Sequence, residues 1–281
     1  MYTTLISAAD LASHTDDKQW VVLDCRHDLM DTNAGQAAYD QGHIPGAQFV
    51  HLDQRLSAEK VGPDGVFRGR HPLPEKADFI ATLQSLGINN DSQVVVYDAH
   101  GGMFAARLWW MLRWVGHRAV AVLDGGLPAW QAAQQALTRE VPVTSAGTIS
   151  ELPALVHTLD VTQVLSNISS AAKTLVDARA ADRYRGENET MDPVGGHIPG
   201  AKNRFFKDNL QADGRFKPAA QLHQEWSPIV SDASQAIMQC GSGVTACHNL
   251  LALEVAGMSG AALYPGSWSE WCADTSRPVE R

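Results

Sequence analysis

The chain has 281 residues, of which 44% are hydrophobic and 19% charged, a composition ordinary for a folded globular protein and unlike disordered sequence. Its length favours two domains. Acidic residues outnumber basic ones by 31 to 22, so the formal net charge of -9 predicts no overall attraction to nucleic acid or anionic lipid. No stretch approaches the roughly 20 apolar residues of a membrane-spanning helix, and the first residues do not resemble a signal peptide.

Four cysteines occur in this long chain, at Cys25, Cys240, Cys247 and Cys272. None of them forms a Cys-x-x-Cys pair, so the sequence predicts neither a zinc ribbon nor a redox dithiol, and four cysteines make no disulfide framework here. We therefore expect reduced thiols and a cytoplasmic location.

The same series of motifs occurs twice along the chain. Four landmarks appear in the same order in both halves: Val21-Val-Leu-Asp-Cys-Arg26 and Leu175-Val-Asp-Ala-Arg179; Gly42-His-Ile-Pro-Gly-Ala47 and Gly196-His-Ile-Pro-Gly-Ala201; Val94-Val-Val-Tyr-Asp98 and Ala236-Ile-Met-Gln-Cys240; Leu123-Asp-Gly-Gly126 and Leu263-Tyr-Pro-Gly266. Such a series indicates a duplicated domain. We expect a first domain over residues 1–138, a linker over 139–156 and a second domain over 157–281.

Short apolar runs alternate with helical patterns in both halves. In chain order, we expect strands at 21–23, 94–97, 119–123, 175–176, 236–238 and 261–264, and helices at 105–115 and 245–256. Short apolar strands that alternate with amphipathic helices are typical of parallel sheets buried on both faces. The sequence therefore predicts an α/β fold with two tandem doubly wound domains, each a parallel sheet flanked by helices.

One cysteine lies in a glycine-rich turn between an expected strand and an expected helix, Gln239-Cys-Gly-Ser-Gly-Val-Thr245. The glycines Gly241 and Gly243 allow successive backbone N–H groups to point inward as an anion-binding nest, and the following helix adds the positive end of its dipole. Such a loop favours the thiolate of Cys240, which is the nucleophilic form. The alternative is a buried structural cysteine, and the surrounding loop favours the nucleophile.

Together these motifs, with the closing Tyr264-Pro-Gly-Ser-Trp-Ser-Glu-Trp271, resemble the rhodanese family in its tandem form over nearly the whole chain. The resemblance implies two rhodanese-like domains and a sulfurtransferase that works through a persulfide on Cys240, with no metal or organic cofactor. It also implies a catalytically silent first copy, because Asp98 stands where the cysteine would be. The loop residues expected to contact the substrate are Gly241, Gly243, Val244 and Thr245.

The composition of the loop distinguishes sulfur donors within the family. Thiosulfate sulfurtransferases carry arginine and lysine after the cysteine, whereas the neutral residues here resemble those of 3-mercaptopyruvate sulfurtransferases. The resemblance then implies a proton-handling triad of Ser242, His71 and Asp53, because cleavage of the C–S bond leaves a carbanion that must be protonated. From the sequence alone, a loop-capping role for His71 is the alternative.

A carboxylate donor calls for arginine, which binds carboxylates with two parallel hydrogen bonds. Arg183 lies where the family places one substrate-binding arginine. The family's second arginine is absent from Glu187-Asn-Glu-Thr-Met-Asp-Pro-Val194, and Arg204 is the candidate substitute. The tyrosine that often lines the pocket is replaced by Phe104.

Three other functions share features with this sequence. A phosphatase of the Cys-x5-Arg class is excluded, because the position six residues after the cysteine is Ala246 rather than arginine. Thiosulfate as the sulfur donor remains an alternative, as does a non-catalytic sulfur-trafficking or binding module. The expected partners are a small sulfur donor and an acceptor such as cyanide, a thiol or thioredoxin, with no nucleic acid and no membrane.

Overall fold

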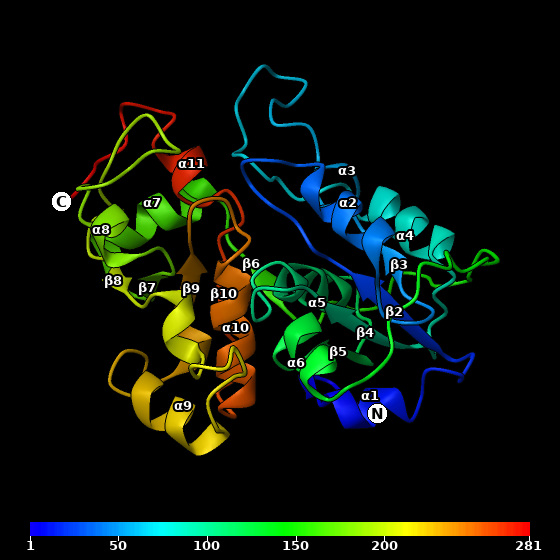
Figure 1. Ribbon diagram of the computed structural model, residues 1–281. Coiled ribbons are helices and arrows are strands. Elements are labelled where there is room, and N and C mark those ends of the chain that lie inside the picture. Colours follow the sequence, from blue (N-terminus) through cyan, green and yellow to red (C-terminus); the bar gives the residue numbers. More distant parts are fainter. The chain divides into compact units, whose positions relative to one another are not determined.

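The computed structural model describes residues 1–281, and the chain divides into two compact units (Figure 1). The first unit consists of Met1–Ser57, Pro74–Leu155 and Gln211–Phe216. The second consists of Ala58–Leu73, Val156–Leu210 and Lys217–Arg281. The units therefore do not follow chain order throughout, since one short segment from each half of the sequence belongs to the other unit.

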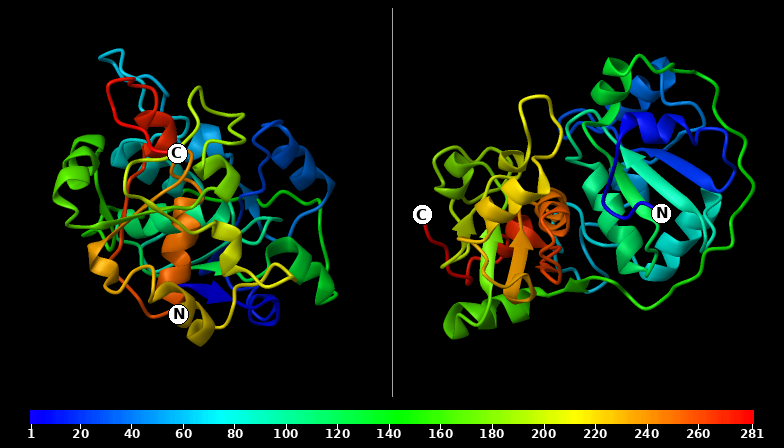
Figure 2. Two further views of the ribbon diagram at one scale, coloured as in Figure 1. Left: turned by 90° about the vertical axis from the view of Figure 1, so that its left-hand side faces the viewer. Right: turned by 90° about the horizontal axis from the view of Figure 1, so that it is seen from below.

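The first unit is built on a five-stranded parallel sheet. Its strand order is β1 (Leu5–Ile6), β5 (Val120–Leu123), β4 (Gln93–Tyr97), β2 (Trp20–Asp24) and β3 (Gln48–Phe49). Helices lie on both sides of this sheet (Figure 2). They are α1 (Ala8–Ala12), α2 (Ala34–Gln41), α3 (Leu52–Arg55), α4 (Lys76–Ser85), α5 (Ala105–Trp114) and α6 (Gly126–Ala132).

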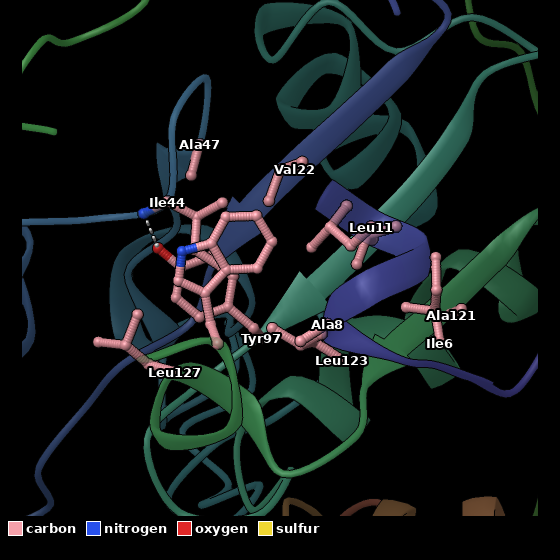
Figure 3. Packing of buried hydrophobic residues seen from close by; sticks show 12 residues of the cluster. Ile6, Ala8, Leu11, Val22, Ile44, Ala47, Tyr97, Ala121, Leu123 and Leu127 are labelled. Atoms are coloured by element: carbon pink, nitrogen blue, oxygen red, sulfur yellow. Dashed lines mark hydrogen bonds between the residues drawn. The ribbon is translucent and has the colours of Figure 1, made fainter. Parts of the chain in front are cut away.

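The central strand β4 explains why this unit needs helices on both faces. All five of its residues are buried, as expected of a central strand in a parallel sheet. On one face, Tyr97 packs in a cluster with residues of α1 and α6 (Figure 3). The Tyr97 hydroxyl donates a hydrogen bond to Asp24 at 2.7 Å and accepts one from the Ile44 amide at 3.3 Å, so its polar end is satisfied inside the core.

The second unit repeats the architecture with the same strand order. Its parallel sheet runs β6 (His157–Thr158), β10 (Ala262–Leu263), β9 (Ala236–Gln239), β7 (Thr174–Asp177) and β8 (Lys202–Asn203). Its helices are α7 (Val161–Ser170), α8 (Ala181–Tyr184), α9 (Ala219–Trp226), α10 (Ala246–Val255) and α11 (Ser267–Trp271), with short 3-10 helices at Phe206–Asn209 and Ala233–Gln235. The predicted α/β fold with two tandem parallel-sheet domains is confirmed, and each predicted strand and helix is present with ends shifted by one residue at most.

The repeated Gly-His-Ile-Pro-Gly motif has the same structural role in both units. The ring of His43 stacks on Tyr39 at 3.8 Å, and its Nδ1 lies 2.9 Å from the Tyr39 carbonyl oxygen. His197 stacks on Tyr184 at 3.7 Å, with its Nδ1 also 2.9 Å from the carbonyl oxygen of that tyrosine. Both histidines therefore hold their loops in place.

The helices are short, and none has both the length and the apolar character that crossing a membrane requires.

Candidate active site

Cys240 follows directly after β9 and begins the glycine-rich loop that leads into α10. Its side chain is buried, and its backbone forms hydrogen bonds with the first residues of α11. The Cys240 amide donates to Ser267 Oγ at 3.1 Å, and the Cys240 carbonyl accepts from the Trp268 amide at 3.0 Å. Gly243 has a φ of +76°, and a β-carbon there would lie 2.3 Å from the Pro265 carbonyl oxygen, so only glycine fits this turn.

The equivalent loop of the first unit shows what such a turn binds. Asp98 follows β4 as Cys240 follows β9, and the Asp98 side chain is fully buried. Its carboxylate accepts four backbone N–H groups, from His100 at 2.8 Å, Gly102 at 3.0 Å, Phe104 at 2.7 Å and Ala105 at 2.9 Å. A buried negative charge surrounded by four amide donors is an anion nest. The first copy thus fills its own nest with a carboxylate.

The repeat relates these amide groups to the cysteine loop. In the first copy, α5 begins at Ala105 and Phe104 precedes it. In the second copy, α10 begins at Ala246 and Thr245 precedes it. In the first copy the His100 amide, two residues after Asp98, donates to the carboxylate. The equivalent amide in the second copy, two residues after Cys240, is that of Ser242. These amides of the second copy therefore correspond to groups that bind a carboxylate in the first copy.

The structure brings together two of the three predicted triad residues. Ser242 Oγ lies 2.8 Å from His71 Nδ1, and both side chains are buried. His71 reaches the second unit through the segment Ala58–Leu73, which belongs to that unit although it comes from the first half of the chain. This contact gives Ser242 a partner that can take or give a proton.

The third predicted triad residue, Asp53, belongs to the first unit, in the first turn of α3. Its carboxylate lies 3.9 Å from His27 Nε2 and 4.0 Å from His51 Nδ1. These three side chains have the chemistry of metal ligands. Each offers one ligand atom, and these atoms lie within 4.8 Å of one another, while His51 Nδ1 accepts a hydrogen bond from the Asp53 amide at 3.1 Å. The triad role of Asp53 stays a prediction.

Two arginines lie against the residue that follows Cys240. A β-carbon placed on Gly241 would lie 2.7 Å from Arg70 Nη2, and 3.7 and 3.8 Å from the two Nη atoms of Arg183. The structure therefore places Arg183 at the loop and adds Arg70, which was not predicted from the sequence. The only sequence feature that pointed to Arg70 was its position beside His71. Arg70 supplies the second cation that is absent from the segment 187–194.

Arg204, the other arginine proposed from the sequence, is bound elsewhere. Its guanidinium donates to Glu225 of α9 at 2.5 Å and lies over the ring of Trp226 at 5.5 Å. Burial raises the pKa of Glu225, but hydrogen bonds from Arg204 and Lys217 outweigh it and bring this pKa to about 2. The structure therefore favours Arg70 over Arg204 as the second cation of the site.

The remaining cysteines lack these surroundings. Burial raises the pKa of the Cys25 thiol well above its usual value and that of Cys272 to about 11, so both remain protonated at neutral pH and are poor nucleophiles. Cys247, on α10, donates its thiol hydrogen to the Gly243 carbonyl at 3.4 Å. Cys240 alone opens a glycine-rich loop.

Comparison with known proteins places this geometry in a family. The model of the rhodanese-like domain matches twice, over residues 7–133 and 160–274. A Pseudomonas aeruginosa protein named "Probable 3-mercaptopyruvate sulfurtransferase" is 46% identical over 98% of this chain and 97% of its own. A thiosulfate sulfurtransferase of Cricetulus griseus is 38% identical over 89% and 84% of the two chains. The crystal structure of the Escherichia coli 3-mercaptopyruvate sulfurtransferase SseA matches with a TM-score of 0.82 at 33% identity, covering 95% of this chain and all of that one.

The chain belongs to the rhodanese family, in its tandem form with two rhodanese-like domains. The family resemblance predicted from the motifs is confirmed, and so is the predicted class of enzyme, because the named relatives are sulfurtransferases. Relatives named for 3-mercaptopyruvate and for thiosulfate both occur, so the donor has to be argued from the site.

Proposed function

We propose that the protein transfers sulfur from 3-mercaptopyruvate to a thiophilic acceptor through a persulfide on Cys240. The observation that carries this proposal is the convergence of Arg70 and Arg183 on Gly241, one residue after the cysteine. Two guanidinium groups suit the carboxylate of the donor. Bound there, the donor would present its sulfur to Cys240.

In the first half of the reaction, the Cys240 thiolate attacks the thiol sulfur of 3-mercaptopyruvate. A new S–S bond forms and the C–S bond breaks, with its electron pair passing to the methylene carbon. The products are a protonated persulfide and the enolate of pyruvate, which takes up one proton to become pyruvate. The persulfide releases its own proton, so one proton is transferred overall and the loop amides stabilise the remaining sulfur anion.

The Ser242–His71 pair supports this choice of donor, because this donor needs proton transfer at the carbon and thiosulfate does not. Ser242 follows Cys240 by two residues, and its hydroxyl contacts an imidazole that can supply the proton. In the second half, the acceptor attacks the outer sulfur of the persulfide. Cyanide leaves as thiocyanate and regenerates the Cys240 thiolate.

The acceptors we propose are cyanide in the test tube and a thiol or thioredoxin in the cell, with a cytoplasmic location. Four free cysteines in the structure support a reducing compartment. The reaction as written uses no metal or organic cofactor.

We expect kcat/KM for 3-mercaptopyruvate to exceed that for thiosulfate by at least about tenfold. Asp192 and Glu189 already balance the charges of Arg70 and Arg183, and the loop itself adds no cation that could make charge-assisted bonds to a dianion, worth about 1.5–3 kcal/mol each. Steady-state kinetics with each donor at saturating cyanide measure the ratio. A higher kcat/KM for thiosulfate would contradict the assignment of the donor. No turnover with either donor would favour the non-catalytic binding module.

We expect His71→Asn to lower kcat for 3-mercaptopyruvate by about 10²–10⁴-fold, the usual contribution of a general acid, while KM changes little. Ser242→Ala should act in the same direction. With thiosulfate, whose sulfite product needs no proton on carbon, both variants should keep most of their activity. Equal losses with the two donors would indicate that the pair only supports the loop.

A further inference from the structure

Two buried acids lie in the segment 187–194, between α8 and the second Gly-His-Ile-Pro-Gly motif. The side chains of Glu189 and Asp192 are each 3% exposed. Glu189 shapes its own loop, because its Oε1 accepts the amides of Met191 at 2.8 Å and Asp192 at 3.1 Å. Its Oε2 accepts from Arg183 Nε at 3.0 Å, and both of its oxygens accept from Arg183 Nη2 at 2.9 Å. Glu189 is therefore a structural part of the site and a fixed partner of Arg183.

Asp192 has a different set of partners. Its Oδ1 accepts from Arg70 Nη1, and its Oδ2 lies 3.4 Å from Arg183 Nη2. No backbone amide donates to this carboxylate. One carboxylate oxygen thus meets each guanidinium, and these are the two guanidiniums that lie against Gly241.

This arrangement is the one that a small carboxylate ligand would adopt between the same arginines. The Arg70 and Arg183 side chains are 18% and 21% exposed, so a ligand can reach them, whereas Asp192 is covered. A charged carboxylate without partners is costly to bury, and Glu189 alone would leave one negative charge for the two guanidiniums. Asp192 avoids that cost while no donor is bound.

We propose that Asp192 is an internal substitute for the carboxylate of the donor and a determinant of donor specificity. It occupies Arg70 and shares Arg183 with Glu189 in the resting protein, and the donor binds by taking over the contacts that Asp192 makes with the two guanidiniums. Because Asp192 leaves one negative charge beside the site, it also disfavours a dianion more than a monoanion. This inference rests on the proposed function.

The test is Asp192→Asn, which keeps the shape of the side chain and removes its charge. We expect KM for 3-mercaptopyruvate to fall by about tenfold with kcat little changed, because the donor no longer competes with a charged internal group. KM for thiosulfate should fall by a larger factor. The matched control is Glu187→Gln in the same segment, since Glu187 pairs with the exposed Arg185 and not with the loop arginines. It removes the same charge and should leave both KM values unchanged.

An unchanged or higher KM in Asp192→Asn would overturn the inference and show that Asp192 orients the arginines. An equal fall in Glu187→Gln would also overturn it, because the effect would then be one of net charge. A different result would contradict the proposed function itself: Cys240 of the wild-type protein would take up no sulfur from 3-mercaptopyruvate.

A measurement on the unmodified protein does not depend on how the variant folds. Pyruvate, the product, carries the same carboxylate as the donor. If it displaces Asp192, saturating pyruvate should speed hydrogen exchange at the amides of Met191 and Asp192, which Glu189 holds in the resting loop. Slower or unchanged exchange at these amides with pyruvate bound would mean that Asp192 is not displaced.

Discussion

Cys240→Ser should abolish sulfur transfer with every donor and acceptor, while the fold is retained. The hydroxyl is similar in size to the thiol, so the backbone of residue 240 can still donate to Ser267 Oγ and accept from the Trp268 amide. A serine hydroxyl is not ionised at neutral pH and has no neighbouring base placed to activate it for attack on sulfur. Thiocyanate formation from either donor with cyanide is the measurement, with circular dichroism to confirm the fold.

The matched control is Cys247→Ser, seven residues further along on α10. A serine hydroxyl can donate to the Gly243 carbonyl as the Cys247 thiol does, so the loop keeps this contact. We expect most of the activity to remain. If Cys247→Ser were as inactive as Cys240→Ser, the loss would reflect damage to the loop rather than loss of the nucleophile.

Asp98→Ala should have the largest effect on stability. The substitution removes the acceptor of four buried backbone N–H groups in the first unit. Each buried donor left without a partner costs about 1–3 kcal/mol, so we expect the free energy of unfolding to fall by at least about 3 kcal/mol. Urea unfolding followed by circular dichroism measures this loss, which is large against a typical total of about 5–15 kcal/mol.

The control for that experiment is Asp98→Asn, which keeps one acceptor oxygen in the nest. It should destabilise the protein by a smaller amount than alanine does. Because the first copy has no cysteine in this loop, the folded fraction of either variant should still form the persulfide on Cys240. An alanine variant as stable as the wild type would contradict the assignment of the Asp98 loop as an anion nest.

The central strands could be predicted because local sequence determines them. β2 and β4 each contain an uninterrupted apolar run of four residues, and the repeat predicts their counterparts β7 and β9 in the second half. The edge strands β1 and β6 were not predicted, because each is only two residues long and shows no periodicity. Their position comes from parallel pairing with β5 and β10, a long-range interaction that no local pattern reveals.

The residues of the site also divide into those that local sequence predicts and those that only long-range contacts reveal. The loop around Cys240 is local in sequence, so its glycines and its place before a helix could be predicted. The pairing of Ser242 with His71 was implied only by the family resemblance, since the two residues lie 171 positions apart. Arg70 and Asp192 were missed because their importance arises from a contact across 122 positions. Arg204 looked available in the sequence because its partner Glu225 lies 21 positions away.

The most direct test of the central claim is the mass of the protein after treatment with 3-mercaptopyruvate and removal of excess donor. The intact protein should gain the mass of one sulfur atom, and peptide mapping should place it on the peptide that contains Cys240. Addition of cyanide should then remove it. Sulfur found on Cys25, Cys247 or Cys272, or no added sulfur at all, would contradict the proposal that this loop carries the transferred atom.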